Sequence, residues 1–398
     1  MFRIKIKYLI LMGLSFVFAY LQGGNLPYSV FYGFTITFLL GLFFILIHKK
    51  KLFVDVKLNK KIYFSGENVF ISMVIQNNTL FPVPYIKIRN KAISNVNSKY
   101  FGDVINLKMD ERKWIKHQLQ FKRRGIYHFG DITISLKDMF SIFETDKYFK
   151  RNATISVYPR IYDIEKSLLK GRDIFKNAIS NKSSIEDMYS TRDIRKYHNG
   201  DNLKRINWKM SAKLNELYVR NFDTVSGQEF NIFLDMGARN YDVDNKGIFE
   251  ELLIDFCSSL LSYMIHREIK TKLFINASRV ESFDIESKVD FDKLMDYFLT
   301  QDSDAKLSFI KFINGNVHMI SSLSGIGIIT GTVDDKFTDT LMSLKDSGNN
   351  IMLFYSGGAT EETKNIDLLC KIGIECFNID NIIVNGSKPG IGGLNGMA

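Results

Sequence analysis

Two long apolar runs open the chain, joined by an uncharged turn that contains two glycines and a proline. Residues 8–22 and 28–47 contain no charged side chain. An α-helix needs about 20 apolar residues to cross roughly 30 Å of hydrocarbon, and the second run supplies them. The first run is shorter, so we expect its helix to extend back through Ile6 and Ile4. The pattern predicts a two-helix transmembrane hairpin over residues 1–51.

Basic residues flank this pair of runs on both sides. Residues 1–51 hold no Asp or Glu, and their six cations lie outside the apolar runs: Arg3, Lys5, Lys7, Lys49, Lys50 and Lys51. Because cytoplasmic flanks carry the Lys/Arg excess, both ends are expected inside, in a cell membrane crossed by two segments, with the soluble domains cytoplasmic. A cleaved signal peptide is the alternative for the first run, but no A-x-A-like cleavage site follows it.

The period of the apolar positions changes twice after the hairpin. Residues 85–89 and 132–136 alternate apolar and polar side chains, and turn residues separate several such stretches, which is typical of a small β sandwich. From about residue 228, short apolar strands alternate with amphipathic helices, which predicts a parallel sheet covered on both faces. The expected architecture is therefore a two-helix transmembrane hairpin, an all-β sandwich-like domain and a Rossmann-like α/β parallel-sheet domain. The boundaries we expect are 1–51 (hairpin), 52–160 (β domain), 161–227 (linking segment), 228–385 (α/β domain) and 386–398 (flexible tail).

Composition and charge narrow the class of function. Apolar residues make up 45% of the 398 and charged residues 24%, which excludes a wholly disordered chain. The net charge is +10, yet residues 224–398 hold 15 basic against 25 acidic side chains, so the excess lies in the N-terminal half. That asymmetry suits a basic half beside an anionic membrane. We expect no nucleic-acid partner, because no reading module accompanies the charge. Three cysteines without a C-x-x-C pair indicate a reducing compartment and no structural zinc site.

The linking segment carries a long motif with an unusual density of charged and aromatic residues. It reads TRDIRKYHNGDNLKRINWKMSAKLNELYVRNFD over residues 191–223. It resembles the signature of the domain-of-unknown-function 58 family, at Arg192, Tyr197, Gly200, Asp201, Arg205, Ile206, Trp208, Lys209, Ser211, Ala212, Lys213, Val219 and Arg220. The β domain adds shorter matches to the same family at Arg124-Gly125, Tyr127, Gly130, Asp138, Phe140, Phe143 and Val157-Tyr158-Pro159.

The resemblance implies a membrane-anchored protein with a von Willebrand factor A-like α/β domain, often encoded beside MoxR-type AAA+ ATPases. Such a domain holds a divalent cation with a D-x-S-x-S sequence after its first strand. Here Asp235 stands at the Asp position, but Gly237 and Arg239 replace the hydroxyl residues. Hard cations need oxygen ligands, so we expect no metal and only a degenerate site remnant at Asp235. No cofactor is expected.

The residues of the motif also have a direct structural interpretation. Gly200-Asp201 predicts a turn in which Asp201 caps a helix over residues 203–214. If Trp208 is buried, its indole N–H needs an acceptor. The arginines and aspartates of the motif are expected to form an ion-pair network that either clamps the segment or binds a partner. No nucleophile–base pair stands out, so no catalytic residue is assigned.

These observations favour a non-enzymatic, membrane-anchored protein-interaction adaptor. Its partners would be membrane lipid through residues 1–51 and a MoxR-type AAA+ ATPase, in envelope-related or chaperone-like assembly. Partner binding is expected at Arg192, Tyr197, Gly200, Asp201, Arg205, Trp208, Lys209, Ser211, Lys213 and Arg220. Two alternatives stay open: a hydrolase or transferase that uses the Asp/Arg-rich motif, and a divalent-metal-dependent ligand-binding module.

Overall fold

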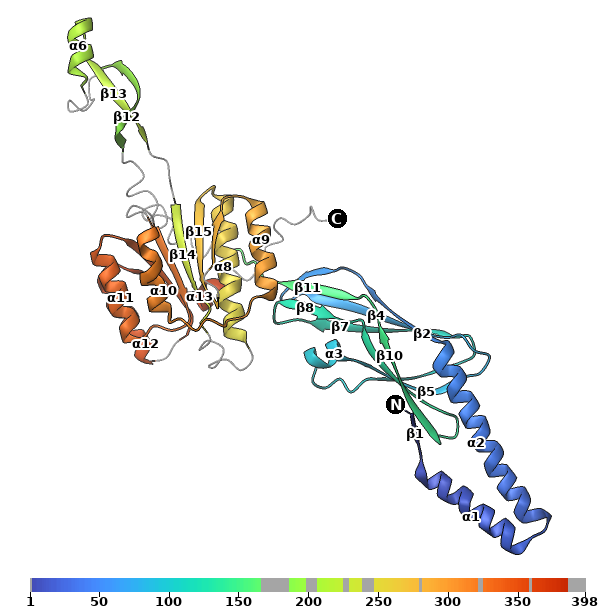
Figure 1. Cartoon of the computed structure of the whole chain (residues 1–398). Coiled ribbons are helices and arrows are strands. Elements are labelled where there is room, and N and C mark those ends of the chain that lie inside the picture. The colour runs from blue at the N-terminus through green and yellow to red at the C-terminus, as the bar shows by residue number, and fades with distance from the viewer. Residues whose placement is uncertain are drawn as a thin grey trace. The chain divides into compact units, whose positions relative to one another are not determined.

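The structure, a computed structural model, forms two compact units, Met1–Tyr158 and Pro159–Ala398 (Figure 1). The described residues are 2–165, 186–197, 206–224, 229–237, 247–278, 281–320, 325–357 and 360–385, with backbone alone for 186–193, 220–224, 360–362 and 385. The expected flexible tail, 386–398, lies outside them.

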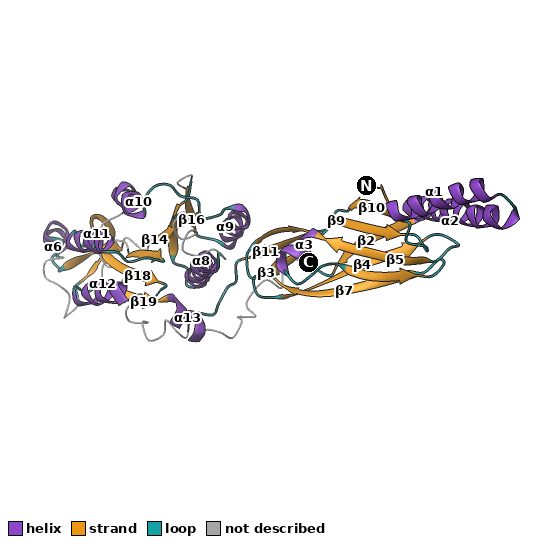
Figure 2. Cartoon of the chain, turned by 90° about the horizontal axis from the view of Figure 1, so that it is seen from below, coloured by secondary structure: helices purple, strands orange, loops and turns teal. Residues whose placement is uncertain are grey.

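The first unit begins with a short strand and two apolar helices. Helix α1 spans Ile6–Gln22 and α2 spans Asn25–Lys51, and the two lie side by side (Figures 1 and 2). By length and composition, α2 is able to cross a membrane, whereas α1 is a shorter apolar helix. The expected backward extension of the first helix reaches Ile6, but its continuation through Ile4 is wrong. Phe2–Ile4 forms strand β1, which pairs with β10 (Phe143–Lys150), because its backbone finds partners in an existing sheet.

Three sheets build the rest of the first unit. The five-stranded sheet has the order β1-β10-β9-β5-β6, with β9 at Asp131–Lys137, β5 at Val83–Asn90 and β6 at Asp103–Leu107. A three-stranded sheet joins β2 (Leu52–Leu58), β4 (Asn68–Asn77) and β7 (Arg112–Gln120). Another joins β3 (Ile62–Phe64), β11 (Thr154–Tyr158) and β8 (Gly125–His128). A short helix, α3 (Lys91–Val96), follows β5.

Alternating side chains explain these strands. In β9, Ile132, Ile134 and Leu136 are buried in a core shared with the strands of the other sheets, as expected for a half-buried strand. Gly130 lies where the chain passes closest to its neighbour, since a Cβ there would stand 1.7 Å from the Arg151 carbonyl oxygen. That close approach gives a packing reason for a glycine that the sequence pattern singled out.

The second unit is built on a six-stranded sheet of order β16-β15-β14-β17-β18-β19. The four strand pairs along β15-β14-β17-β18-β19 are parallel, and the pair of β15 with the edge strand β16 is antiparallel. The strands are β14 (Glu229–Asp235), β15 (Lys270–Asn276), β16 (Glu281–Ile285), β17 (Gly325–Thr330), β18 (Asn350–Tyr355) and β19 (Glu375–Asn378). The helices are α8 (Ile248–His266), α9 (Lys288–Thr300), α10 (Phe309–Asn316), α11 (Asp335–Asp346), α12 (Thr360–Lys371) and α13 (Ile379–Asn385).

Helices cover both faces of this sheet (Figure 1). On one face, Phe233 of β14 packs against Phe312 of α10; on the other, Phe256 of α8 packs against Phe354 of β18. Strands buried on both faces read as continuous apolar runs, and this is why β14, β15, β17 and β18 were recognisable in the sequence. The edge strands β16 and β19 are less apolar and were not predicted.

Candidate functional site

The family-like motif folds into a small module of its own secondary structure. Strand β12 (Glu186–Lys196) pairs antiparallel with β13 (Tyr218–Thr224), and helix α6 (Trp208–Leu214) lies between them in sequence. We call β12, α6 and β13 the β12–β13 module. The chain closes on itself through backbone bonds from Tyr197 to Leu217 and from Asn207 to Tyr218, both 2.8 Å. The motif is therefore a folded hairpin and not an extended linker.

The helix of the module starts later than the sequence predicted. Asn207 is its N-cap residue, and its side-chain oxygen accepts a hydrogen bond from the Met210 amide at 3.3 Å. Ile206, just before the cap, forms a bridge with Val219 instead of a helical turn. The expected helix over 203–214 is thus wrong at its start, because strand pairing holds the backbone that precedes Asn207. Asp201, the expected cap, lies outside the described residues.

Buried groups hold α6 against β13. Ile206 and Val219 are buried, and the buried Ser211 hydroxyl accepts a hydrogen bond from the Tyr218 amide at 2.9 Å. Ser211 therefore provides an acceptor for the Tyr218 amide, which is not paired with another strand. Its role in the structure is to position β13, so the side chain has a packing reason to be in the motif.

The outer side of the module exposes large apolar side chains beside lysines. Trp208 is 67% exposed, and three further apolar side chains are more than one-third exposed: Met210, Leu214 and Leu217. Lys209 and Lys213 are exposed on the same helix. Tryptophan at this exposure is unusual for a surface that meets only water, and it is among the residues that dominate binding interfaces. The buried indole considered in the sequence is therefore not what the structure shows.

The remaining residues of the predicted site are only partly described. Tyr197 lies at the end of β12, while Arg192 and Arg220 lie on β12 and β13 and are described by their backbone alone. Gly200, Asp201 and Arg205 lie outside the described residues. The expected ion-pair network of the motif therefore stays a prediction. One ion pair of the module is described, between Lys196 and Glu216, and the bond to Glu216 raises the pKa of Lys196.

Asp235 stands at the carboxyl end of β14, as expected, and is buried. One of its carboxylate oxygens accepts from the Gly237 amide at 3.1 Å, and the other accepts from the Thr330 hydroxyl at 3.0 Å. The side chain thereby ties the end of β14 to the end of β17. A divalent cation would need further oxygen ligands, and Gly237 has no side chain to offer one. The described part of this site does not fit a cation held as in von Willebrand A domains.

Sequence reasoning missed a polar cluster in the first unit. The carboxylate of Asp103 accepts from the Tyr100 hydroxyl at 2.8 Å and lies 2.9 Å from His117 Nε2. Burial acts to raise the pKa of Asp103, but these hydrogen bonds and the charge of His117 outweigh it and lower the pKa below its ordinary value. His117 lies on β7, Asp103 is the first residue of β6 and Tyr100 precedes that strand, so no local spacing marks the three residues. The cluster fastens the start of β6 to β7 and contains no nucleophile.

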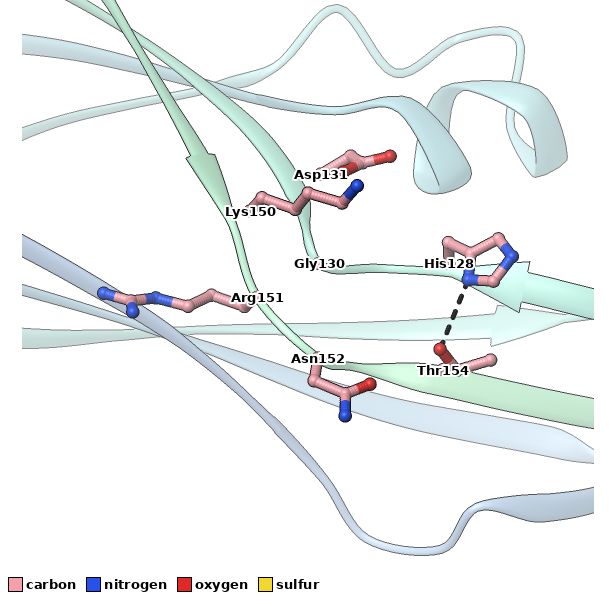
Figure 3. Close-up of a pocket in the computed structure, with 7 residues that line it drawn as sticks. All are labelled: His128, Gly130, Asp131, Lys150, Arg151, Asn152 and Thr154. Atoms are coloured by element: carbon pink, nitrogen blue, oxygen red, sulfur yellow. Dashed lines mark hydrogen bonds between the residues drawn. The ribbon is translucent and has the colours of Figure 1, made fainter.

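An open pocket of about 540 Å³ lies on the same unit, lined by His128, Gly130, Asp131, Lys150, Arg151, Asn152 and Thr154 (Figure 3). His128 Nδ1 lies 3.2 Å from the Thr154 hydroxyl. These two residues are register partners on β8 and β11, which accounts for their contact. Within the described ranges, no group of three or more His, Cys, Asp or Glu side chains gathers in a way that would hold a metal. The pocket therefore offers polar contacts and no recognisable catalytic arrangement.

Comparison with known proteins finds a family match that covers most of the module. Residues 193–286 match the sequence model of the family described as Protein of unknown function DUF58. An uncharacterized protein of Bacillus subtilis (strain 168), YeaD, is 22% identical over 267 residues, which is 64% of this chain and 62% of that protein. The match thus spans less than two-thirds of the relative's length.

Solved structures resemble parts of the chain weakly. The CARDB domain of the PF1109 protein from Pyrococcus furiosus covers 27% of this chain and 91% of its own, at 16% identity and a TM-score of 0.19. Proximal thread matrix protein 1 from the mussel byssus covers 40% of this chain and 45% of its own, at 8% identity and a TM-score of 0.29. Their fold likeness is too low to guide function. The segment 193–286, which includes most of the β12–β13 module and Asp235, therefore carries the sequence signature of the DUF58 family of proteins of unknown function.

Proposed function

We propose that this protein is a membrane-anchored protein-interaction adaptor whose β12–β13 module binds a partner. The observation that carries the proposal is the 67% exposure of Trp208 on a helix that lies inside the segment matched by the family. An exposed tryptophan beside other apolar side chains and lysines has the composition of a binding hot spot. The buried Ser211 and Val219 beneath it keep this surface in one conformation before binding.

The anchor in this proposal is the pair α1 and α2, as a transmembrane hairpin with both ends on the cytoplasmic side. α2 has the length and hydropathy of a membrane span, with Lys49, Lys50 and Lys51 in its last turn. The first unit then forms a sandwich-like spacer. The six-stranded sheet of the second unit, with helices on both faces, supports a von Willebrand A-like fold whose cation site has become a structural tie at Asp235.

The partner in this proposal is a MoxR-type AAA+ ATPase, as the family resemblance implies. Lys209 and Lys213 follow Trp208 on the exposed helix α6, so the module suits a partner that offers acidic groups beside an apolar patch. Binding, and not catalysis, is favoured because the described side chains of the module serve packing or face solvent. The adaptor would then present clients to the ATPase during envelope-related or chaperone-like assembly.

The test is co-purification of the tagged, detergent-solubilised full chain with and without ATP, followed by mass spectrometry. We expect enrichment of an AAA+ ATPase, and its loss for Trp208→Ala, since truncation of a hot-spot tryptophan costs about 2–4 kcal/mol, or roughly 30- to 1000-fold in affinity. The matched control is Trp114→Ala, because Trp114 is the other tryptophan of the chain and lies on β7. If no AAA+ ATPase is enriched, or if both variants lose it equally, the proposal fails.

A further inference from the structure

The last turns of α2 are packed against the β strands of the first unit. Gly41, Ile45 and His48 are buried. A Cβ at Gly41 would stand 3.0 Å from a carboxylate oxygen of Asp138 and 3.1 Å from the Phe143 ring. The helix therefore does not leave the β strands on a free linker, and its depth in a membrane fixes the depth of what it touches.

Two loops of the first unit hold these helices. The 78–82 loop, between β4 and β5, contacts α2 through Phe81, whose ring centroid lies 4.9 Å from that of Phe44 and whose carbonyl oxygen lies 3.1 Å from His48 Nε2. The 138–142 turn, between β9 and β10, contacts Gly41. It also accepts a hydrogen bond, at the Ile142 carbonyl, from the Lys5 amide just before α1. Both helices are thus fixed at the level of these two loops.

The helical rise places the loops relative to a bilayer. At 1.5 Å per residue, Gly41 lies about 24 Å and Phe44 about 28 Å along α2 from its start at Asn25. The hydrocarbon core is about 30 Å thick. α1 supplies 17 residues, or about 26 Å, before Lys5 is tied to the 138–142 turn. If the hairpin reaches across the hydrocarbon, the loops that contact Gly41 and Phe44 come to lie at its near boundary.

The side chains at the tips of the loops suit that position. Leu80 is 80% exposed, and Met139 and Phe140 are about half-exposed. The backbone behind them is fixed. The buried Asn77 donates to the Phe81 carbonyl at 2.8 Å, and the buried Asp138 carboxylate accepts from the Phe140 amide at 3.0 Å. Apolar side chains held outward on rigid loops need little ordering when they enter an apolar phase.

Cations gather next to the point where α2 ends. Lys147 donates to the Leu52 carbonyl at 3.2 Å, and Arg151 donates to the Val54 carbonyl at 2.8 Å. Burial lowers the pKa of Lys147, and the nearby positive charges of Arg151 and Lys49 lower it further. Three cations therefore lie close together at this end of α2. Along α2, Lys49 lies about 36 Å from Asn25, at the level of the headgroups. Anionic headgroups would relieve the repulsion between these cations.

We propose that the 78–82 loop and the 138–142 turn insert Leu80, Met139 and Phe140 into the membrane interface. The β strands of the first unit then contact an anionic bilayer surface directly, in addition to being anchored through α1 and α2. This inference rests on the proposed membrane anchor. Its consequence is that the membrane, through the docked helices, fixes the orientation of the first unit.

The test measures the depth of single tryptophans in the full chain reconstituted into vesicles of phosphatidylcholine and phosphatidylglycerol. The native tryptophans are replaced (Trp114→Phe, Trp208→Phe), and one tryptophan is returned at Leu80 or at Met139. Quenching by lipids brominated on the acyl chain reports contact with hydrocarbon. The matched control is Phe101→Trp, because Phe101 is 79% exposed. Phe101 follows α3, which begins where β5 ends, whereas the 78–82 loop precedes the start of β5. Leu14→Trp, in α1, reports the anchor itself.

We expect brominated lipid to quench the Leu80→Trp and Met139→Trp proteins with a blue-shifted emission, close to the loss seen for Leu14→Trp, and to leave Phe101→Trp unquenched. Quenching at Leu14→Trp without quenching at either loop would overturn this inference and leave the anchor standing. Absence of quenching at Leu14→Trp would overturn the anchor, and the inference with it. Equal quenching of Phe101→Trp would mean non-specific adsorption and would also count against the proposal.

Discussion

The contact between α2 and the 138–142 turn can be tested by a single added methyl group. Gly41→Ala would place a Cβ 3.0 Å from Asp138 Oδ2 and 3.1 Å from the Phe143 ring. Neither neighbour is free to move. The Asp138 carboxylate is held by the Phe143 amide at 2.6 Å, and the Phe143 ring is buried, with the Phe38 ring centroid 4.9 Å away. The alanine is therefore expected to push the helix and the turn apart.

Two effects of opposite sign set the size of the change. Alanine favours a helix over glycine by about 1 kcal/mol. Overpacking a well-filled contact costs about 1–3 kcal/mol. Gly33→Ala, in the same helix, should show only the gain in helix preference, since nothing lies within 4 Å of a Cβ at that position. The difference between the two variants therefore isolates the overpacking, and for a unit of this size each kcal/mol corresponds to about 2–4 °C in Tm.

The assay is thermal unfolding of the detergent-solubilised full chain, followed by the emission of Trp114, which lies in β7 of the same unit, with Trp208 replaced by Phe. We expect Gly41→Ala to melt several degrees below Gly33→Ala. If Gly41→Ala is as stable as Gly33→Ala or more so, α2 does not pack on the turn as described, and the depth argument for the two loops loses its basis.

Three further predictions follow from buried or hydrogen-bonded groups. Because Asp103 has a lowered pKa, its stabilisation is present above its ordinary value of 3.8 and is lost as the pH falls through the folded-state pKa. In denaturant unfolding, the difference in the free energy of unfolding between wild type and Asp103→Asn should thus become smaller as the pH is lowered. A difference that grows on acidification would contradict the hydrogen-bonded cluster of Asp103 with His117. Calorimetric titration with Mg²⁺ should give only the heat of dilution, since Asp235 serves as a tie between strands; saturable heat that Asp235→Ala abolishes would restore the metal-dependent alternative. Burial raises the pKa of the Cys257 thiol, so maleimide should label exposed Cys370 first in the native protein, and early mass-spectrometric detection of label on Cys257 would refute its burial.

The sequence determined those elements whose apolar pattern is uninterrupted. The buried strands β14, β15, β17 and β18 are apolar because both of their faces meet other apolar groups. The run of α2 is long and apolar enough to cross a membrane. The alternation in β9 likewise marked a strand with one buried face. The motif around Trp208 and the position of Asp235 at a strand end were also visible, because both depend on residues that are neighbours in the chain.

The tertiary structure decided everything that depends on a partner distant in sequence. Residues before α1 form a strand instead of a helical extension because β10 offers unpaired backbone groups. Asn207, and not Asp201, caps α6 because Ile206 is held by Val219. Asp235 became a tie because Thr330, 95 residues later, donates to it. Such choices are made by hydrogen-bonding groups that burial forces to find partners, and no local pattern records which distant partner is at hand.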